Sequence, residues 1–192
     1  MTDQPDQPDP TTDPTTDPDV GLSHYRADGA AHMVDVSAKD VTRREATATA
    51  VLRTRRDVVA RIASGDLPKG EAIATARVAG IMGAKRTPDL VPLCHPLPIS
   101  GVEIDVVPSD GSGPGGAGTV EIRATVRTTG RTGVEMEALT AVTVAGLTLY
   151  DMIKAVDKAA VLTDVQVVAK SGGKSGDWTR AASATAADGE GA

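Results

Sequence analysis

The sequence predicts one α+β domain, in which helices cover one face of an antiparallel sheet. Two observations support this class. Segments that alternate polar and apolar residues, as half-buried strands do, are interleaved with segments whose apolar residues recur at helical spacing. The chain has 192 residues, 40% of them hydrophobic, which is enough for one domain of ordinary size. Only 2% are aromatic, so we expect a core of Val, Leu, Ile, Ala and Met.

The first predicted elements are a strand and two helices. Residues 45–52 alternate polar and small apolar side chains, which favours a strand. Thr54 can cap a helix that ends at Gly65. The second helix, residues 71–85, is rich in alanine, and its small side chains would let another backbone approach closely.

A proline-rich segment follows at residues 87–98. Its four prolines are expected to exclude both helix and sheet interior. Its apolar residues nevertheless indicate that it packs against the domain. An ordered, partly buried loop of this kind is a candidate binding site.

The second half contains two strands, a long helix and a last strand. Residues 102–107 and 119–127 alternate as strands and are joined by the Gly-rich residues 108–118. Apolar residues at helical spacing predict a helix over residues 134–160, and residues 165–169 form the last strand. The order β-α-α-β-β-α-β is a split βαβ, or ferredoxin-like, arrangement with an extra helix.

The two ends of the chain differ from this domain, which we place at residues 21–180. Residues 1–20 hold five of the twelve prolines and six aspartates, and residues 181–192 are rich in Ala and Gly. We expect the first tail to be disordered and the second to be loose, because neither can bury enough apolar surface. Without the acidic residues of both tails the net charge changes from −6 to +2. A mildly basic domain suits a small anionic ligand and is too weakly charged to indicate nucleic-acid binding.

The few cysteines and histidines indicate the cellular compartment and whether the chain could hold a metal ion. Cys94 is the single cysteine, which excludes an intrachain disulfide and fits a reducing compartment. Neither a signal peptide nor an apolar run approaching a membrane span is apparent, so we expect a cytoplasmic protein. Cys94 and His95 could both ligate zinc, but the chain has no second cysteine and no H-x-x-x-H pair. We therefore predict no metal and no cofactor.

The same two residues have other candidate roles. We expect Cys94 to be a buried structural thiol rather than a nucleophile. His95 could serve packing, or it could transfer protons or bind a ligand. Both alternatives stay open for His95.

The segment from Ser171 to Gly176 superficially resembles a phosphate loop. The Walker pattern requires a glycine where this chain has Val168, so that interpretation is rejected. Adjacent glycines still leave backbone N–H groups free to approach an anion, and Lys170 and Lys174 lie beside them. The alternative is a flexible loop with solvated lysines.

The predicted long helix carries Glu137, Asp151 and Lys154 within one polar stripe. Such a stripe is usually a solvated face. However, Asp151 and Lys154 are three residues apart, so the carboxylate can hold the ammonium, and burial of the pair would suit Lys154 for acid–base chemistry. Glu137 and Asp151 are separated by about 21 Å along a continuous helix. Both can touch one small substrate only if the helix start is unwound or a neighbouring subunit completes the site.

Several motifs together resemble the cyclic pyranopterin monophosphate synthases, the molybdenum cofactor biosynthesis protein C family. The resemblance runs in order from about Gly29 to Trp178. The motifs are His32-Met-Val-Asp-Val-Ser37, Lys69-Gly70 with Ala74-Thr-Ala-Arg-Val-Ala-Gly80, Leu93-Cys-His-Pro-Leu97, Thr132-Gly-Val-Glu-Met-Glu-Ala-Leu-Thr140, Leu149-Tyr-Asp-Met-Ile-Lys-Ala-Val156 and Ala169-Lys-Ser-Gly-Gly-Lys-Ser-Gly-Asp177.

The resemblance implies a ferredoxin-like subunit in a homohexamer, a trimer of dimers with active sites at subunit interfaces. It implies a phosphorus–oxygen lyase that converts 3′,8-cyclo-7,8-dihydroguanosine 5′-triphosphate to cyclic pyranopterin monophosphate and releases pyrophosphate. The catalytic residues it implies are Asp151, Lys69 and Lys154. The substrate-binding residues are Leu93, Cys94, His95, Glu135, Met136 and Glu137, and we expect Lys170 and Lys174 to hold phosphates.

Two alternatives from other classes are a non-catalytic nucleotide- or phosphate-binding module on the same fold, and an interaction protein that uses its acidic tail. The acid–base residues at 69, 95, 137, 151 and 154 favour the enzyme, because a binding module needs cations without paired carboxylates.

Overall fold

The structure is a computed structural model, which describes residues 31–111, 117–174 and 176–181. The chain divides into the units Met1–Val34 and Asp35–Ala192, and the domain described below is the second unit. The predictions of a disordered tail at residues 1–20 and a loose tail at 181–192 fall on residues that, except for Ala181, lie outside the described ranges.

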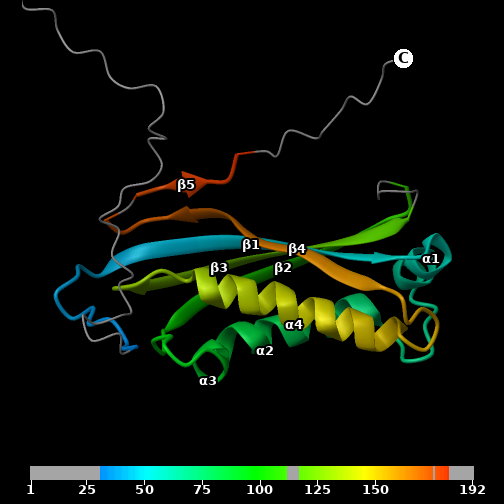
Figure 1. The fold of residues 1–192 in the computed structure, drawn as a ribbon, viewed down its shortest axis with the longest axis horizontal. Helices are drawn as coiled ribbons and strands as arrows, with labels where there is room; N and C mark the ends of the chain where they lie inside the picture. Colours follow the sequence, from blue (N-terminus) through cyan, green and yellow to red (C-terminus); the bar gives the residue numbers. More distant parts are fainter. Residues whose placement is uncertain (1–30, 112–116, 175, 182–192) are drawn as a thin grey trace, which may run out of the picture. The chain divides into compact units, whose positions relative to one another are not determined.

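One antiparallel sheet and a layer of helices on one of its faces make up this unit (Figure 1). The strands are β1 (Thr42–Thr54), β2 (Ile99–Ser109), β3 (Gly118–Gly130), β4 (Val161–Ser171) and β5 (Trp178–Thr179). The helices are α1 (Arg56–Ser64), α2 (Ala72–Lys85), α3 (Thr87–Leu90) and α4 (Glu135–Ile153). The strand order is β2-β3-β1-β4-β5, and every neighbouring pair is antiparallel. The prediction of an α+β, ferredoxin-like fold with helices on one face is confirmed.

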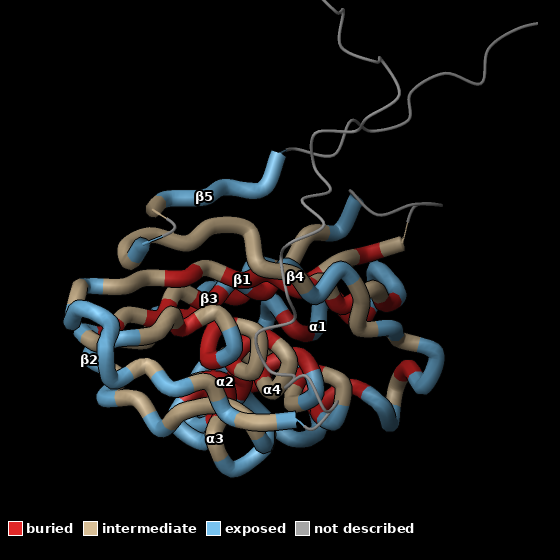
Figure 2. The backbone as a smooth tube through the Cα atoms, turned by 60° about the vertical axis from the view of Figure 1, so that its left-hand side comes forward, coloured by how far each residue is buried: buried red, intermediate tan, exposed pale blue. Residues whose placement is uncertain are grey.

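Side-chain alternation decides which face of the sheet is covered. In β1 the side chains of Ala46, Ala48, Ala50 and Leu52 are buried, whereas Thr47 and Val51, which alternate with them, are only partly buried. Figure 2 shows the buried stretches gathered where β1 and β3 face α2 and α4. The apolar set therefore forms the core between sheet and helices, and the opposite face of the sheet is polar.

Small residues allow α2 and α4 to pack closely, as the composition of residues 71–85 predicted. A Cβ atom added at Gly80 would lie 2.9 Å from the carbonyl oxygen of Ala141 in α4. A Cβ at Gly83 would lie 2.9 Å from the Cβ of Val144. The two helix backbones are therefore closer than alanine at either position would permit.

Three local predictions are wrong. Thr54 does not cap α1, since the N-cap residue is Arg55 and the Thr54 hydroxyl bonds elsewhere. A short helix, α3, forms inside the proline-rich segment because Pro88 lies in its first turn, where a missing N–H is tolerated. The long helix ends at Ile153 rather than near Ala160, since the chain turns there and Asp157 bonds to the end of β1.

Helix α4 also corrects the expectation that no apolar run approaches a membrane span. Among the helices in the described part of the chain, α4 alone is long and apolar enough, with 19 residues and a mean hydropathy of 1.3. Half of it is buried inside the domain, where it packs on β1, β3 and β4 and against α2. Its apolar character is accounted for by this central position in the core.

Candidate active site

Helix α4 carries two groups of candidate residues, one at each end. We call Asp151, Lys154 and Lys69 the Asp151 cluster, and Glu135, Glu137, Cys94 and Lys170 the Glu137 cluster. The helix runs without interruption from Glu135 to Ile153. The separation of about 21 Å between Glu137 and Asp151 therefore holds.

The Asp151 cluster joins three residues from two distant parts of the chain. The ammonium of Lys69 lies 2.5 Å from one carboxylate oxygen of Asp151 and donates a second bond, of 2.9 Å, to its backbone carbonyl. The ammonium of Lys154 lies 2.7 Å from the other carboxylate oxygen. All three predicted catalytic residues thus meet around one carboxylate.

The turn between α1 and α2 places Lys69 in this cluster. The backbone N–H of Gly70 donates to the carbonyl of Leu67 at 2.9 Å, and Gly70 has a φ of 89°. Glycine adopts this left-handed conformation without steric penalty, so the turn can reverse direction directly after Lys69. The ammonium of Lys69 then reaches the end of α4.

Electrostatic interactions in the Asp151 cluster favour the ionised carboxylate of Asp151 and the protonated amine of Lys154. Hydrogen bonds from Lys154 and then Lys69 lower the pKa of Asp151 to about 2, and Asp151 in turn raises the pKa of Lys154. The burial that would have suited Lys154 to act as a base is not present, since its side chain is half exposed. A lysine of this kind acts as a proton donor or stabilises an anion.

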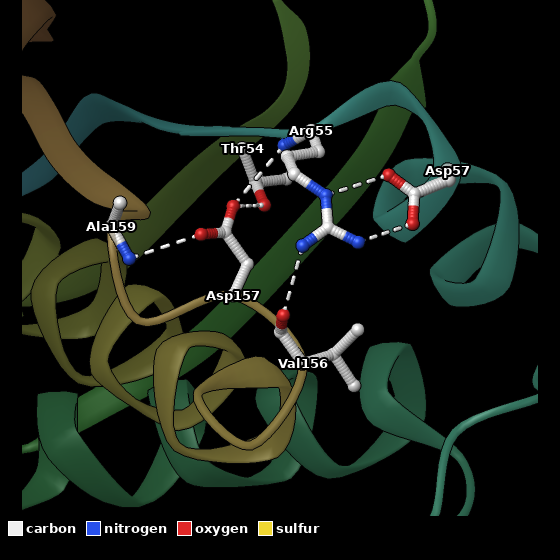
Figure 3. Close-up of polar contacts among 6 residues, drawn as sticks. All are labelled: Thr54, Arg55, Asp57, Val156, Asp157 and Ala159. Atoms are coloured by element: carbon white, nitrogen blue, oxygen red, sulfur yellow. Dashed lines mark hydrogen bonds and ion pairs between the residues drawn. The ribbon is translucent and has the colours of Figure 1, made fainter.

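A second carboxylate holds the turn that follows Lys154 (Figure 3). Buried Asp157 accepts hydrogen bonds from the hydroxyl of Thr54 at 2.7 Å, from the backbone N–H of Ala159 at 3.0 Å and from that of Arg55 at 3.3 Å. Arg55 donates to the carbonyl of Val156 at 3.0 Å. The segment carrying Lys154 is thereby tied to the end of β1.

Sequence reasoning missed the role of Asp157, although a signal was present. Asp157 follows Ile153 by four residues, so on the predicted helix it lies on the apolar stripe rather than on the polar face. A charged residue at such a position needs buried partners. Two of the partners, Thr54 and Arg55, lie at the end of β1, some 100 residues earlier in the chain, and only the tertiary structure shows them.

The Glu137 cluster is less exposed than the Asp151 cluster. Glu137 is 3% exposed, and burial followed by the charge of Glu135 raises its pKa. Burial and then the charge of Glu137 raise the pKa of Cys94, so its thiol is protonated at neutral pH. Cys94 was expected to be buried, but the structure leaves its side chain only partly buried. Lys170 forms an ion pair with Glu135 at 3.4 Å.

Of the remaining predicted site residues, Leu93, His95 and Met136 are neighbours of this cluster in the sequence. Leu93 and His95 are half-buried in the segment after α3, and Met136 is 40% exposed at the start of α4. Hydrogen bonds from the backbone and side chain of Ser37 lower the pKa of Asp35, and His95 contributes a further electrostatic lowering. Lys174 is exposed in the turn after β4, where it lines a cavity together with Lys39, Thr42 and Arg44.

No three histidine, cysteine, aspartate or glutamate side chains in residues 31–111, 117–174 and 176–181 are grouped so that they could hold a metal ion.

These features define an antiparallel α+β domain of the ferredoxin-like class, with a lysine–aspartate cluster suited to proton donation and anion binding. The chain belongs to the MoaC family, whose model matches residues 33–173.

Curated relatives agree with this family over most of the chain. The cyclic pyranopterin monophosphate synthase of Streptomyces coelicolor is 62% identical over 159 residues, which cover 83% of this chain and 89% of the relative. That of Corynebacterium efficiens is 60% identical over 160 residues, covering 82% and 97%. Cyclic pyranopterin monophosphate synthase 2 of Mycobacterium tuberculosis is 59% identical over 159 residues, covering 83% and 91%.

Proposed function

We propose that this chain is a cyclic pyranopterin monophosphate synthase of molybdenum cofactor biosynthesis. It converts 3′,8-cyclo-7,8-dihydroguanosine 5′-triphosphate to cyclic pyranopterin monophosphate and releases pyrophosphate, which makes it a phosphorus–oxygen lyase. The observation that carries this proposal is the Asp151 cluster, because it gathers the three residues that the family resemblance marks as catalytic. The synthase names of relatives at about 60% identity support the same reaction.

The chemistry of this cluster suits the reaction. The rearrangement requires proton transfers at carbon and nitrogen, and the departing pyrophosphate must be stabilised. Lys69 and Lys154 are positively charged and are held on opposite oxygens of Asp151. Their ammonium groups can donate protons, a contribution of about 10²- to 10⁴-fold, and can stabilise the anionic leaving group.

The geometry of α4 favours an active site shared between subunits of a homohexamer, a trimer of dimers. Since the helix begins at Glu135, it is not unwound at Glu137, and both ends cannot approach one small substrate within a subunit. A second copy that places its Glu137 cluster beside the Asp151 cluster of the first would complete the site. The cytoplasm, where the substrate would be made from a nucleotide, is the proposed location.

The proposed reaction is tested by incubating the purified chain with the cyclic dihydroguanosine triphosphate and measuring pyranopterin product and pyrophosphate. We expect both with the wild-type chain and neither with Asp151→Asn. A chain that binds the substrate tightly without forming either product would instead be the non-catalytic binding module, and the proposed activity would be wrong.

Subunit mixing tests the shared site. Glu137→Ala and Asp151→Ala should each be inactive, and mixed oligomers should regain activity because some pockets contain only intact contributions. For a two-pocket dimer with free exchange, about half of the dimers would be mixed, each with about one intact pocket. Activity that stays at the level of the parents, although subunit exchange is verified by mass spectrometry, would exclude a shared site.

A further inference from the structure

The side chains of the Asp151 cluster are not confined by packing. Those of Asp151 and Lys154 are each 52% exposed, and that of Lys69 is 42% exposed. Lys154 is the first residue after α4 and still has a helical backbone, with φ −56° and ψ −24°. Because solvent surrounds much of each side chain, the distances between the three charged groups depend on the backbone at the end of α4.

The end of α4 provides Lys69 with one of its two hydrogen bonds. The N–H of Lys154 donates to the carbonyl of Tyr150 at 2.8 Å, which is the last helical bond of α4. The carbonyl of Asp151 lies beyond that bond and, as an end carbonyl, needs a partner from elsewhere. Lys69 is that partner, at 2.9 Å. In a helix continued to residue 160, the N–H of Ala155 would occupy this carbonyl instead.

A turn stops the helix at this point. The N–H groups of Val156 and Asp157 both donate to the carbonyl of Ile153, at 2.8 and 2.9 Å. These bonds are local, and helix ends fray readily. The turn therefore needs contacts from another element to keep one geometry.

Asp157 supplies such contacts from a buried position (Figure 3). One of its carboxylate oxygens accepts hydrogen bonds from the hydroxyl of Thr54 at 2.7 Å and from the N–H of Arg55 at 3.3 Å. The other oxygen accepts from the N–H of Ala159 at 3.0 Å. Thr54 is only 4% exposed and Asp157 only 8%, so water competes little for these bonds. The carboxylate thus joins the turn to the end of β1.

Arg55 adds a second link to the same turn. Its guanidinium donates to the carboxylate of Asp57 at 2.9 Å and to the carbonyl of Val156 at 3.0 Å. The pairing with Asp57 orients the guanidinium toward the turn. Since the Arg55 side chain is exposed, we expect this link to contribute less than the buried bonds of Asp157.

We propose that Asp157 is a positioning residue of the active site: by binding the end of β1 it ends α4 at Ile153 and so holds Asp151 where both lysines reach it. The inference rests on the proposed function for the reaction that the lysines serve. The hydrogen bonds of Asp157 go to the turn and to β1, so it acts on the cluster through the backbone of residues 153–157. A displacement of reacting groups by about 1 Å can lower a rate by about 10²-fold.

Thr54 offers a matched pair of substitutions that separates positioning from stability. Thr54→Val removes the hydroxyl bond to Asp157 at nearly constant volume, whereas Thr54→Ser keeps the hydroxyl and removes a buried methyl group. Both should lower the melting temperature of the full chain.

Turnover of the cyclic dihydroguanosine triphosphate is then measured at a temperature at which circular dichroism shows each variant to be folded. Thr54→Val should lower kcat by about 10-fold and change KM by less than about 2-fold, because the lysines act in the chemical step. Thr54→Ser should keep kcat within about 2-fold of the wild-type value.

Lysine labelling tests the geometry without turnover. Asp151 raises the pKa of Lys154, so little of its amine is neutral and its acetylation by trace acetic anhydride at pH 8 should be slow. We expect Thr54→Val and Asp157→Asn to accelerate this acetylation by about 3-fold, which corresponds to a pKa lower by about 0.5, as measured by mass spectrometry. Thr54→Ser should leave the rate unchanged. Lys85, exposed at the end of α2, is the internal reference.

An unchanged rate of Lys154 acetylation in Thr54→Val would overturn the proposal, whatever the activity. In a chain that turns over, an unchanged kcat of Thr54→Val would do the same. So would an equal loss of kcat in Thr54→Val and Thr54→Ser, because packing rather than the bond to Asp157 would then govern activity. Faster acetylation in Thr54→Val, in a chain whose wild type forms no product, would refute the synthase and keep the positioning of the cluster by Asp157.

Discussion

The ammonium of Lys69 lies 2.5 Å from a carboxylate oxygen of Asp151, although Asp151 comes 82 residues later in the chain. Lys154 occupies the other carboxylate oxygen, so each oxygen of Asp151 has its own cation. The contact joins the turn between α1 and α2 to the last turn of α4. It brings together residues to which the proposed function gives a catalytic role and that no local pattern connects.

Asp151→Asn should reduce kcat by at least about 100-fold, because it removes the negative charge that holds two ammonium groups in place. The melting temperature should hardly change, since all three side chains are substantially exposed and exposed ion pairs contribute little to stability. Steady-state kinetics and calorimetry on the same preparation check both parts. A large loss of stability would show instead that the cluster is structural.

Glu137→Gln should stabilise the fold at pH 7.5 and leave it unchanged at pH 4. Burial raises the pKa of Glu137 above its unfolded-state value of 4.5. Above pH 4.5 this carboxyl group therefore ionises more readily in the unfolded chain than in the folded chain, and the folded state loses stability. Gln removes that loss, which we expect to be on the order of 1 kcal/mol, or about 2–4 °C in Tm for a chain of this size.

Thermal melts of both proteins at the two pH values measure this difference. Glu137→Asp, which keeps the ionisable group, is the control and should not gain stability at pH 7.5. An equal change in Tm at pH 4 and pH 7.5 would contradict a titration effect. If Glu137→Gln is also inactive, the buried charge is retained for function at the expense of stability.

Asp157→Ala should lower the free energy of unfolding by about 2–4 kcal/mol, because it leaves the donors of Thr54, Arg55 and Ala159 without their acceptor. The hydrogen bond from Thr54 is the largest cause of the lowered pKa of Asp157. The stabilisation that ionised Asp157 provides is therefore complete above its unfolded-state pKa of 3.8. It is lost as the pH falls from there through the lower pKa of the folded state.

Urea unfolding at pH 7 measures the change, and a double-mutant cycle with Thr54→Val isolates the hydroxyl bond, for which we expect a coupling of about 1 kcal/mol. Asp157→Asn keeps one acceptor oxygen and should be milder than alanine. Additive effects of the Thr54 and Asp157 substitutions would mean that their bond contributes nothing.

Gly80→Ala should destabilise the protein by about 1–3 kcal/mol even though alanine favours helix more than glycine does. The added Cβ would lie 2.9 Å from the backbone carbonyl oxygen of Ala141, and a backbone atom cannot yield as a flexible side chain can. Ala74→Gly on the exposed face of the same helix is the control, and it should cost about 1 kcal/mol from propensity alone. A stabilised Gly80→Ala would show that α2 and α4 are farther apart than described.

The order of strands and helices could be predicted from the sequence because the signals are local. Alternation in residues 45–52 and helical spacing in residues 71–85 are each visible within a few turns of chain. Element ends were predicted less well, since they depend on contacts elsewhere. The long helix was extended to Ala160, but the bonds from Asp157 to the end of β1 belong to a turn after Ile153.

By itself the sequence determined the fold class and the family motifs, and with them the residues of both ends of α4. The tertiary structure alone decided which of these residues meet and in what charge state. Lys69 reaches Asp151 only because the turn before α2 lies beside the end of α4. Burial of the Asp151–Lys154 pair would have suited Lys154 for acid–base chemistry. Packing instead leaves Lys154 half exposed and Asp151 raises its pKa, whereas Glu137 lies in the core. Burial and long-range pairing depend on how the helices and sheet pack together, which no local periodicity encodes.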